Sequence, residues 1–344
     1  MRGVLPIVAL VAVVVLLVGC GGSDGSSTGT STEAAPQSKP KQPPRESSIT
    51  LDGYAGPENV GVLMANWEDY FDEFGLKVTI YSPNEPVRPV QYTATGTVDV
   101  GVSREPELVL AQSQGIPVVA IGSLIAQPTA AMIWLGKSQI NDIADLKGKT
   151  IGTAGLPMQE ALLGAVLAKA GLSLDDVKLK NSRYNMVPAL AKGRVDAIFG
   201  ASRNLEGVQL ETMGLDPVIT PVEDLGVPPY EELLMIAPRD RLKKEPQLFR
   251  DFVAAVNRGT ATSIEDPDLA LETVNESVES DYRVTPQARE AQVEATLPLL
   301  SESGEMDPAQ AKRLVDWMYS EGMIKKKPPV SSLLTNEYLP QSGQ

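Results

Sequence analysis

The sequence predicts an α/β fold built as two similar lobes. Short apolar runs typical of buried strands alternate along the chain with segments of helical periodicity. One phrase occurs twice, in residues 90–107 and 184–209. Two extended apolar segments, near 130–136 and 232–238, enclose the region that contains the second copy and are interpreted as hinge strands. The predicted architecture is therefore a clamshell of two α/β lobes joined by two hinge strands.

The repeated phrase has the same order in both copies. A helical segment leads to Gly-x-Val-Asp at 96–99 and 193–196, then to a short apolar strand, to Ser-Arg, and to a new helix. The shared Gly-x-Val-Asp is interpreted as scaffold. In open α/β sheets ligands bind beyond the carboxyl ends of the strands, so the polar residues after these two strands are expected at a site between the lobes.

The remaining elements follow from periodicity and from glycine stops. Residues 59–74 carry apolar side chains at three- and four-residue spacing, and Gly75 is placed to end that helix. Gly115 and Gly171 end two further helices in the same way. From Arg239 onward the pattern is helical. Strands are expected at 49–51, 77–81, 117–124, 150–153, 177–180 and 217–221, and further helices at 86–94, 108–114, 157–169 and 208–213.

Composition excludes several classes of function. A net charge of −14 over 344 residues argues against nucleic acid, because phosphate binding needs a basic face. The chain has no histidine, and Cys20 is its one cysteine, which removes disulfides and the usual nitrogen and sulfur metal ligands. We expect the protein to bind no metal or cofactor. We also expect it to be a monomer.

The N-terminus predicts a membrane-anchored extracytoplasmic protein. Arg2 precedes an apolar run at 4–18 that ends in Leu-Val-Gly-Cys, which resembles a bacterial lipobox. We expect a signal peptide at 1–19, a lipid on Cys20 that holds the protein on the outer face of the cytoplasmic membrane, and a disordered tether at 20–48. The alternative is an ordinary signal or a single transmembrane anchor. Lobe 1 is predicted at 49–131 plus 237–344, and lobe 2 at 132–236.

Several phrases carry a family resemblance over about residues 49–339. They are Leu-Lys-Gly-Lys-Thr-Ile-Gly at 146–152, Val-Pro-Ala-Leu at 187–190, Glu-Gly-Val-Gln-Leu-Glu at 206–211, Gly-Val-Pro-Pro-Tyr at 226–230 and Thr-Asn-Glu-Tyr-Leu at 335–339. With them the chain resembles bacterial ABC-importer substrate-binding proteins of the thiamine-pyrimidine type, and also the eukaryotic thiamine-pyrimidine synthases. The resemblance implies a type II periplasmic-binding-protein clamshell, an aminopyrimidine thiamine precursor as ligand, and an ABC permease with its ATPase as partners.

The chain departs from the family pattern where ligand contacts are expected. Members often carry Trp, Pro-Asn and His after the first strand, whereas Gly53 and Asn59 stand at the Trp and His positions here. Many members have an aromatic residue where this chain has Arg104 and Arg203. Another flat heterocycle, or an organic anion such as a sulfonate or carboxylate, therefore stays open as the ligand.

Arg104 and Arg203 follow equivalent strands, so closure could bring both guanidinium groups onto one anion. The alternative is salt bridges to Glu105, Glu107 or Glu206. Glu206 and Glu232 are expected to accept hydrogen bonds from an amino group on a heterocycle. The alternatives are a helix-capping carboxylate for Glu206 and a surface charge for Glu232. The full set of expected ligand-binding residues is Tyr54, Asn59, Ser103, Arg104, Glu105, Gly155, Tyr184, Asn185, Arg203, Glu206, Tyr230 and Glu232.

The other candidates rest on general chemistry. The tyrosines could stack on a flat ring, although a core or rim tyrosine is the more common case. Gly155 opens a helix whose N–H groups could hold an anion, or it is a plain strand–helix turn. Asn59 could orient a ligand together with Ser103, or it could cap the helix that it begins.

Catalysis and sensing are the two alternative classes of function. The eukaryotic synthases depend on iron, an internal histidine and a cysteine-rich segment, and the matching region here is 227–233, without cysteine or histidine. Catalysis is therefore not expected. A sensor or co-receptor ectodomain is the third class, and the sequence does not decide against it.

Overall fold

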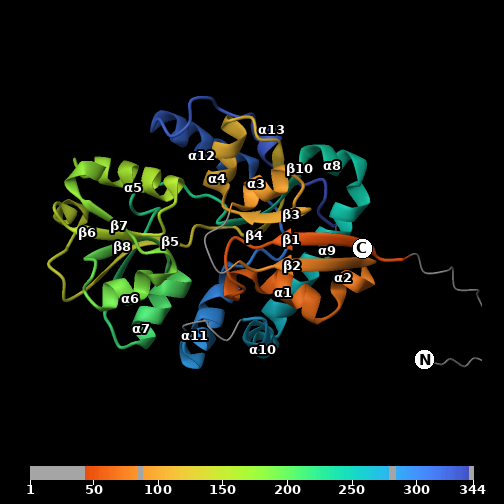
Figure 1. Cartoon of the computed structure of the whole chain (residues 1–344), viewed down its shortest axis with the longest axis horizontal. Helices are drawn as coiled ribbons and strands as arrows, with labels where there is room; N and C mark the ends of the chain where they lie inside the picture. Colours follow the sequence, from red (N-terminus) through yellow and green to blue (C-terminus); the bar gives the residue numbers. More distant parts are fainter. Residues whose placement is uncertain (1–42, 84–87, 279–283, 341–344) are drawn as a thin grey trace, which may run out of the picture. The chain divides into compact units, whose positions relative to one another are not determined.

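The computed structural model describes residues 43–83, 88–278 and 284–340, and these form two five-stranded sheets (Figure 1). The first sheet has the order β2-β1-β3-β10-β4. In this sheet β3 runs parallel to β1 and antiparallel to β10. Its strands are β1 (Arg45–Thr50), β2 (Leu76–Tyr81), β3 (Val100–Ser103), β4 (Val118–Ile125) and β10 (Leu233–Pro238).

The second sheet repeats this topology with the order β7-β6-β8-β5-β9. Here β8 runs parallel to β6 and antiparallel to β5, so it occupies the position of β3 in the first sheet. The expected two-lobed α/β fold is confirmed. The strands are β5 (Ala130–Leu135), β6 (Thr150–Thr153), β7 (Lys178–Asn181), β8 (Ala197–Ser202) and β9 (Pro217–Pro221).

Helices cover both faces of each sheet (Figure 1). The longest, α9, packs against α1, and α5 lies across the second sheet from α6 and α7. Beyond those given below, the helices are α3 (Pro89–Ala94), α4 (Glu105–Ser113), α5 (Pro157–Lys169), α6 (Met186–Ala191), α7 (Val208–Thr212), α8 (Arg239–Lys244), α9 (Pro246–Glu265), α10 (Pro267–Ser277), α11 (Pro286–Thr296), α12 (Pro308–Ser320) and α13 (Val330–Leu333).

The aspartates of the repeated Gly-x-Val-Asp phrase anchor equivalent strands. The Asp99 carboxylate accepts from the backbone N–H of Ser48 at 2.7 Å, and the Asp196 carboxylate accepts from that of Thr150 at 2.7 Å. The preceding Gly96 and Gly193 have φ of 72° and 63°, which side chains rarely adopt. The phrase is therefore scaffold, as the sequence indicated.

The two extended apolar segments are not hinges. They are β5 and β10, each of which pairs with two strands inside a single sheet. The chain crosses between the sheets at 126–129 and 222–232 instead. Both predicted lobe boundaries, 131/132 and 236/237, therefore fall inside strands. The strong apolarity of β5 and β10 reflects their burial in the middle of a sheet. Periodicity alone does not distinguish such a strand from an apolar hinge segment.

Two boundaries near the N-terminus also differ from expectation. β1 begins at Arg45, so residues 45–48 pair with β2 rather than belonging to the predicted tether. The expected helix over 59–74 is divided into the short helix η1 (Pro57–Asn59), α1 (Val60–Trp67) and α2 (Tyr70–Glu73). Asp69, with φ of 55°, breaks it between α1 and α2. Residues 1–42, which include Cys20, lie outside the described residues.

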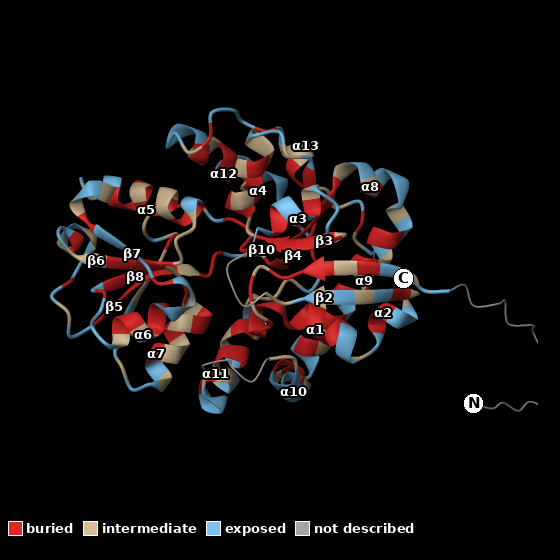
Figure 2. Ribbon diagram, viewed as in Figure 1, coloured by how far each residue is buried: buried red, intermediate tan, exposed pale blue. Residues whose placement is uncertain are grey.

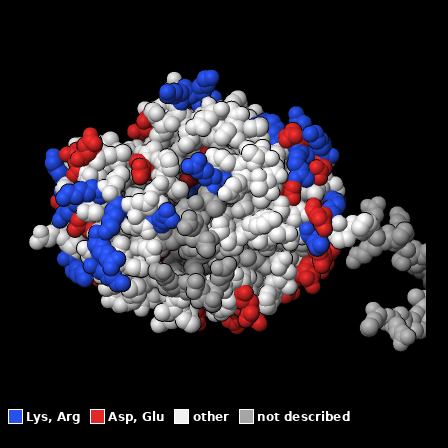
Figure 3. Space-filling model, viewed as in Figure 1, with Lys and Arg blue, Asp and Glu red and all other residues white. Residues whose placement is uncertain are grey.

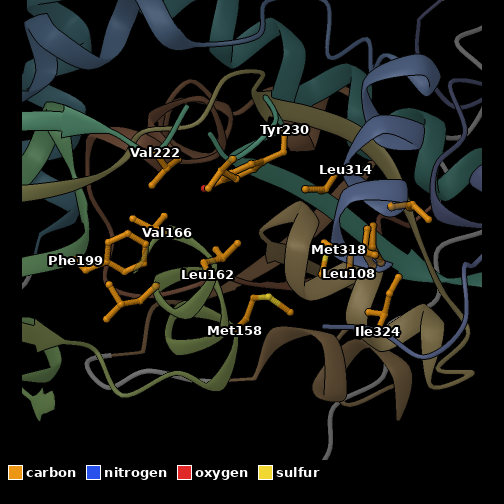
Figure 4. Packing of buried hydrophobic residues seen from close by; sticks show 14 of the residues in the cluster. Leu108, Met158, Leu162, Val166, Phe199, Val222, Tyr230, Leu314, Met318 and Ile324 are labelled. Atoms are coloured by element: carbon orange, nitrogen blue, oxygen red, sulfur yellow. The ribbon is translucent and has the colours of Figure 1, made fainter. Parts of the chain in front are cut away.

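Apolar side chains fill the interior on both sides of the sheets, and the buried positions follow the strands and the inner helix faces (Figure 2). One apolar cluster includes residues of both lobes, from Phe199 and Leu162 to Leu108 and Leu314 (Figure 4). Within the described part of the chain, no helix combines the length and apolarity that crossing a membrane requires.

Asp99→Ala is expected to destabilise the protein more than Asp196→Ala. Asp99 also accepts from the Ser48 hydroxyl at 2.9 Å and pairs with Arg241, whereas Asp196 is exposed and Thr150 is its partner. Loss of the Asp99 contacts should cost about 1–3 kcal/mol. Urea unfolding of both variants measures this, and an equal or larger loss in Asp196→Ala would contradict it.

Candidate functional site

Arg104 joins the two chain crossings. It lies directly after β3 and begins α4, and its Nε donates to Glu232 Oε1 at 2.7 Å while its Nη1 contacts Asp52 Oδ2 at 2.9 Å. Glu232, 1% exposed, ends the second crossing. Its other oxygen accepts from the backbone N–H of Thr129, in the first crossing, at 2.8 Å. A single carboxylate thus fixes both crossings and one guanidinium.

Glu58 and Asn204 extend these contacts from one lobe to the other. Glu58, in η1, accepts at 3.3 Å from the Thr129 hydroxyl and at 3.3 Å from the Asn204 amide. Asn204, just after β8, also donates to the hydroxyl of Thr296 in α11 at 2.8 Å. We call the connected side chains the interlobe network; its members are Asp52, Glu58, Arg104, Thr129, Asn204, Glu232 and Thr296.

Buried acceptors without a partner surround the interlobe network. Among the described residues, Asn59 Oδ1, Asn204 Oδ1 and Gln292 Oε1 are buried and have no hydrogen-bond partner. The same holds for Glu107 Oε2. A buried acceptor that lacks a donor costs about 1–3 kcal/mol, so an ordered water, an ion or a ligand usually supplies the donor to such a group.

Burial perturbs the carboxyl groups here. Desolvation raises the pKa of Glu58 to about 8; the Glu232, Asp52 and Glu206 carboxylates add to this, and Arg104 opposes it. Burial also raises the pKa of Glu107 to about 7 and that of Glu206 above its ordinary value. Buried carboxyl groups with raised pKa values are typical of functional sites.

Arg104 and Arg203 do not converge on one anion in this structure. Arg203, which follows β8 as Arg104 follows β3, pairs with Glu223 at 3.3 Å. Salt bridges were the alternative interpretation, but the expected partners were wrong, since Arg104 binds Asp52 and Glu232 instead. Glu206 acts as a local cap, because its carboxylate accepts from the backbone N–H of Ser202 at 2.8 Å.

The tyrosines are placed differently from the expectation of ring stacking. Tyr230 is 1% exposed and belongs to the apolar cluster of both lobes, where it lies between Val222 and Leu314 (Figure 4). It is a core tyrosine. Tyr54 is half-buried in the loop that follows β1. The side chain of Tyr184 lies outside the described residues.

Ser103 and Asn59 are buried at the first sheet, whereas Glu105 faces elsewhere. The Glu105 carboxylate accepts from the backbone N–H of Glu231 at 2.8 Å, and burial raises its pKa to about 8. Asn59 precedes α1 but makes no side-chain capping bond, so the capping alternative was wrong. Its buried oxygen keeps it as a candidate ligand contact.

Gly155 and Asn185 belong to a separate part of the second lobe. A Cβ at Gly155 would stand 2.2 Å from the Asn181 amide nitrogen, and φ there is 76°, so glycine is required by the turn itself. Asn185 lines a hollow of about 400 Å³ with Lys180, Lys192 and Arg194. Basic side chains gather over this lobe, at the left of Figure 3. No described contact links the hollow to the interlobe network.

Sequence reasoning missed four members of the interlobe network: Asp52, Glu58, Thr129 and Thr296. It expected the polar residues after the second repeated strand, Asn204 among them, at the site, but did not include Asn204 in the set of ligand-binding residues. Asp52 follows β1 closely, so the rule of strand ends applied to every strand would have found it. Thr129 and Thr296 carry no signal in the sequence. Their roles depend on segments 71 and 92 residues away from them.

The comparisons place the chain in a family. Residues 56–270, more than half of the 344, match the model of proteins described as NMT1/THI5 like. The chain belongs to the NMT1/THI5-like family. A protein of Haemophilus influenzae named as a thiamine biosynthesis protein is 31% identical over 280 residues, which cover 81% of this chain and 88% of that one.

Other relatives in the NMT1/THI5-like family differ in their named roles. The formylaminopyrimidine-binding protein of Halalkalibacterium halodurans is 26% identical over 81% of this chain and 86% of its own. The 4-amino-5-hydroxymethyl-2-methylpyrimidine phosphate synthase of Legionella pneumophila is 28% identical over 65% and 71%.

A solved structure supports the fold. The alkanesulfonate-binding protein SsuA of Xanthomonas axonopodis, bound to MOPS, superposes with a TM-score of 0.66 at 19% identity, over 85% of this chain and 98% of that one. The expected periplasmic-binding-protein fold, with its two-lobed clamshell, is therefore confirmed.

We expect stability to fall as pH rises from about 4.5 to about 8. Glu58 and Glu105 keep their protons to about pH 8, and Glu107 and Glu231 to about pH 7, whereas the unfolded chain loses them near 4.5. The folded state therefore binds more protons in this window, and its advantage is lost as pH rises. Thermal unfolding should give a higher Tm at pH 5 than at pH 8.

The matched control for this pH dependence is Glu58→Gln, which removes one of the four groups and should reduce the slope of Tm against pH. A Tm that rises between pH 5 and pH 8 would contradict the protonation states given above.

Proposed function

We propose that this protein is the extracytoplasmic solute-binding component of an ABC importer and that it captures an aminopyrimidine thiamine precursor. The observation that carries the proposal is the set of buried acceptor oxygens around the interlobe network. The fold, the formylaminopyrimidine-binding relative and the lipobox-like Cys20 support it. In this proposal the lipid on Cys20 holds the protein at the outer face of the cytoplasmic membrane, next to the permease.

The acceptors suit an amino-substituted ring. Asn204 follows β8 of the second sheet, and Asn59 precedes α1 in the first lobe, so a ligand held by both would be contacted from both lobes. Gln292 lies in α11, which packs against both η1 and α7. Binding that engages both lobes favours the closed conformation by its difference in affinity for the two states. An aminopyrimidine offers the N–H donors that these oxygens lack.

An organic anion fits less well. The Arg104 guanidinium is already neutralised by Asp52 and Glu232, and Arg203 is paired with Glu223. A sulfonate bound here would find no cation in the interlobe network that is not already paired with a carboxylate. The sulfonate-binding neighbour therefore informs the fold and not the ligand.

A synthase is the second candidate, because several relatives carry that name. The iron that the resemblance implies does not fit the donors present. The chain has no histidine, and Cys20 is its only cysteine. Across residues 43–83, 88–278 and 284–340, no group of three or more Asp, Glu, Cys or His side chains is placed to hold a metal. We therefore propose binding without catalysis.

Aminopyrimidines should raise the Tm of the fragment 42–344, which forms one compact unit, in proportion to the logarithm of their concentration. The panel is formylaminopyrimidine, 4-amino-5-hydroxymethyl-2-methylpyrimidine, riboflavin and MOPS. At about 100 times Kd the expected stabilisation is ~2.7 kcal/mol. Stabilisation by MOPS or riboflavin without any by the aminopyrimidines would refute the proposal.

Asn204→Ala should weaken aminopyrimidine binding by about 10-fold, because it removes a buried acceptor and one interlobe contact. Arg203→Ala, at the adjacent position, is the matched control and should change Kd by less than about 2-fold, since that side chain is partly exposed and already paired. Isothermal titration calorimetry gives both values. Equal losses in the two variants would argue against the interlobe site.

A further inference from the structure

The interlobe network and its surroundings hold more acid than base. Five carboxyl groups, those of Asp52, Glu58, Glu107, Glu206 and Glu232, interact with the single guanidinium of Arg104. Asp52 and Glu232 pair with it directly. Among the described residues, Glu58, Glu107 and Glu206 have no salt-bridge partner. Three carboxyl groups are thus left without a cation, that of the buried Glu58 and those of the half-buried Glu107 and Glu206.

The side-chain amide oxygens of Gln292 and Asn204 add further acceptors near Glu58. The hydrogen bonds of the two amide nitrogens fix the orientation of each side chain. Gln292 Nε2 donates to the Leu205 carbonyl at 2.9 Å, so Gln292 Oε1 is the end without a partner. The Thr296 hydroxyl donates to the backbone carbonyl of Gln292 at 2.7 Å. Its oxygen therefore accepts from Asn204 Nδ2 at 2.8 Å. The unpartnered atoms of both side chains are therefore acceptors, and each residue is at most 3% exposed.

Glu58 is the carboxyl group that these neighbours share. It faces Arg104 at the start of α4, Glu232 before β10, Asp52 after β1 and Glu206 after β8. Of the elements packed against Glu58, α1 and β4 contain no titratable residue. The third, α11, carries Glu290 and Glu294, which are exposed, and the half-buried Arg289, which donates to Asn275. Burial raises the pKa of Glu58 to about 8, so it is protonated near neutral pH without ligand.

We propose that the site binds its solute as a cation, a ring with a protonated nitrogen conjugated to an amino group, and that Glu58 is ionised in the complex. This inference rests on the proposed function. When the free solute is already a cation, the exchange is balanced: the cation enters, the Glu58 carboxyl group releases one proton to solvent, and the charge of the site is unchanged. The N–H groups of such a ring donate to the carboxylate and to the unpartnered amide oxygens.

The test uses two probes of the same shape. The first, 4-amino-2-methylpyridine, carries a ring-nitrogen proton at neutral pH; the second, 3-methylaniline, has carbon in place of that nitrogen and is neutral. Calorimetry at pH 7 in phosphate and in Tris counts protons from the difference in observed enthalpy. We expect the pyridinium to bind at least about 10-fold more tightly, with release of about one proton.

Two variants identify the group that loses the proton. Glu58→Gln should abolish proton release and weaken pyridinium binding. Glu231→Gln is the control, because burial raises the pKa of Glu231 to about 7 but its carboxylate accepts from Ser123, away from the interlobe network. In that variant both proton release and affinity should be unchanged. Tm measured at pH 5 confirms that both variants fold.

The outcomes separate the two proposals. Binding of formylaminopyrimidine with no preference between the two probes, or with no proton released by the pyridinium, would overturn the cation inference and leave the proposed function standing. Absence of binding by formylaminopyrimidine and by both probes would overturn both. Proton release that persists in Glu58→Gln would overturn the assignment to Glu58.

Discussion

The contact between Arg104 and Glu232 is the interaction on which the arrangement of the site depends. Glu232 is almost completely buried in the second crossing, and its two oxygens reach Arg104 of the first lobe and Thr129 of the first crossing. A buried ion pair is often neutral for stability, but removing one partner leaves an uncompensated charge. The pair therefore specifies geometry: it places Thr129 where its hydroxyl can meet Glu58, and through Glu58 it reaches Asn204.

That geometry bears directly on the proposed ligand chemistry. In this chain the positions after β3 and β8 are arginines, which on their own favour an anionic ligand. Their neighbours favour the opposite ligand charge, because Asp52, Glu232 and Glu223 neutralise the two arginines and further carboxyl groups, that of the buried Glu58 among them, remain. The charge balance of the whole cluster, and not the identity of its most conspicuous residue, decides what the site attracts.

Sequence reasoning could predict the features that are encoded locally. The repeat of Gly-x-Val-Asp, strand and Ser-Arg gave the equivalence of β3 and β8, and with it Arg104. Family phrases gave the fold. The roles of Glu58, Thr129 and Thr296 could not be predicted, because their partners lie 71 to 146 residues away and have no shared local pattern. The hinge was misplaced because an apolar central strand and an apolar linker look alike in sequence.

The central claim is that the buried acceptors of both lobes bind the amino group of a heterocycle. A crystal structure of the protein with formylaminopyrimidine tests this most directly. The account predicts the ring between the lobes, with its amino group within hydrogen-bond distance of Asn204 Oδ1 or of the Glu58 carboxylate. A ring bound in the hollow beside Lys180, or held through Arg203 with Asn204 and Glu58 untouched, would contradict it.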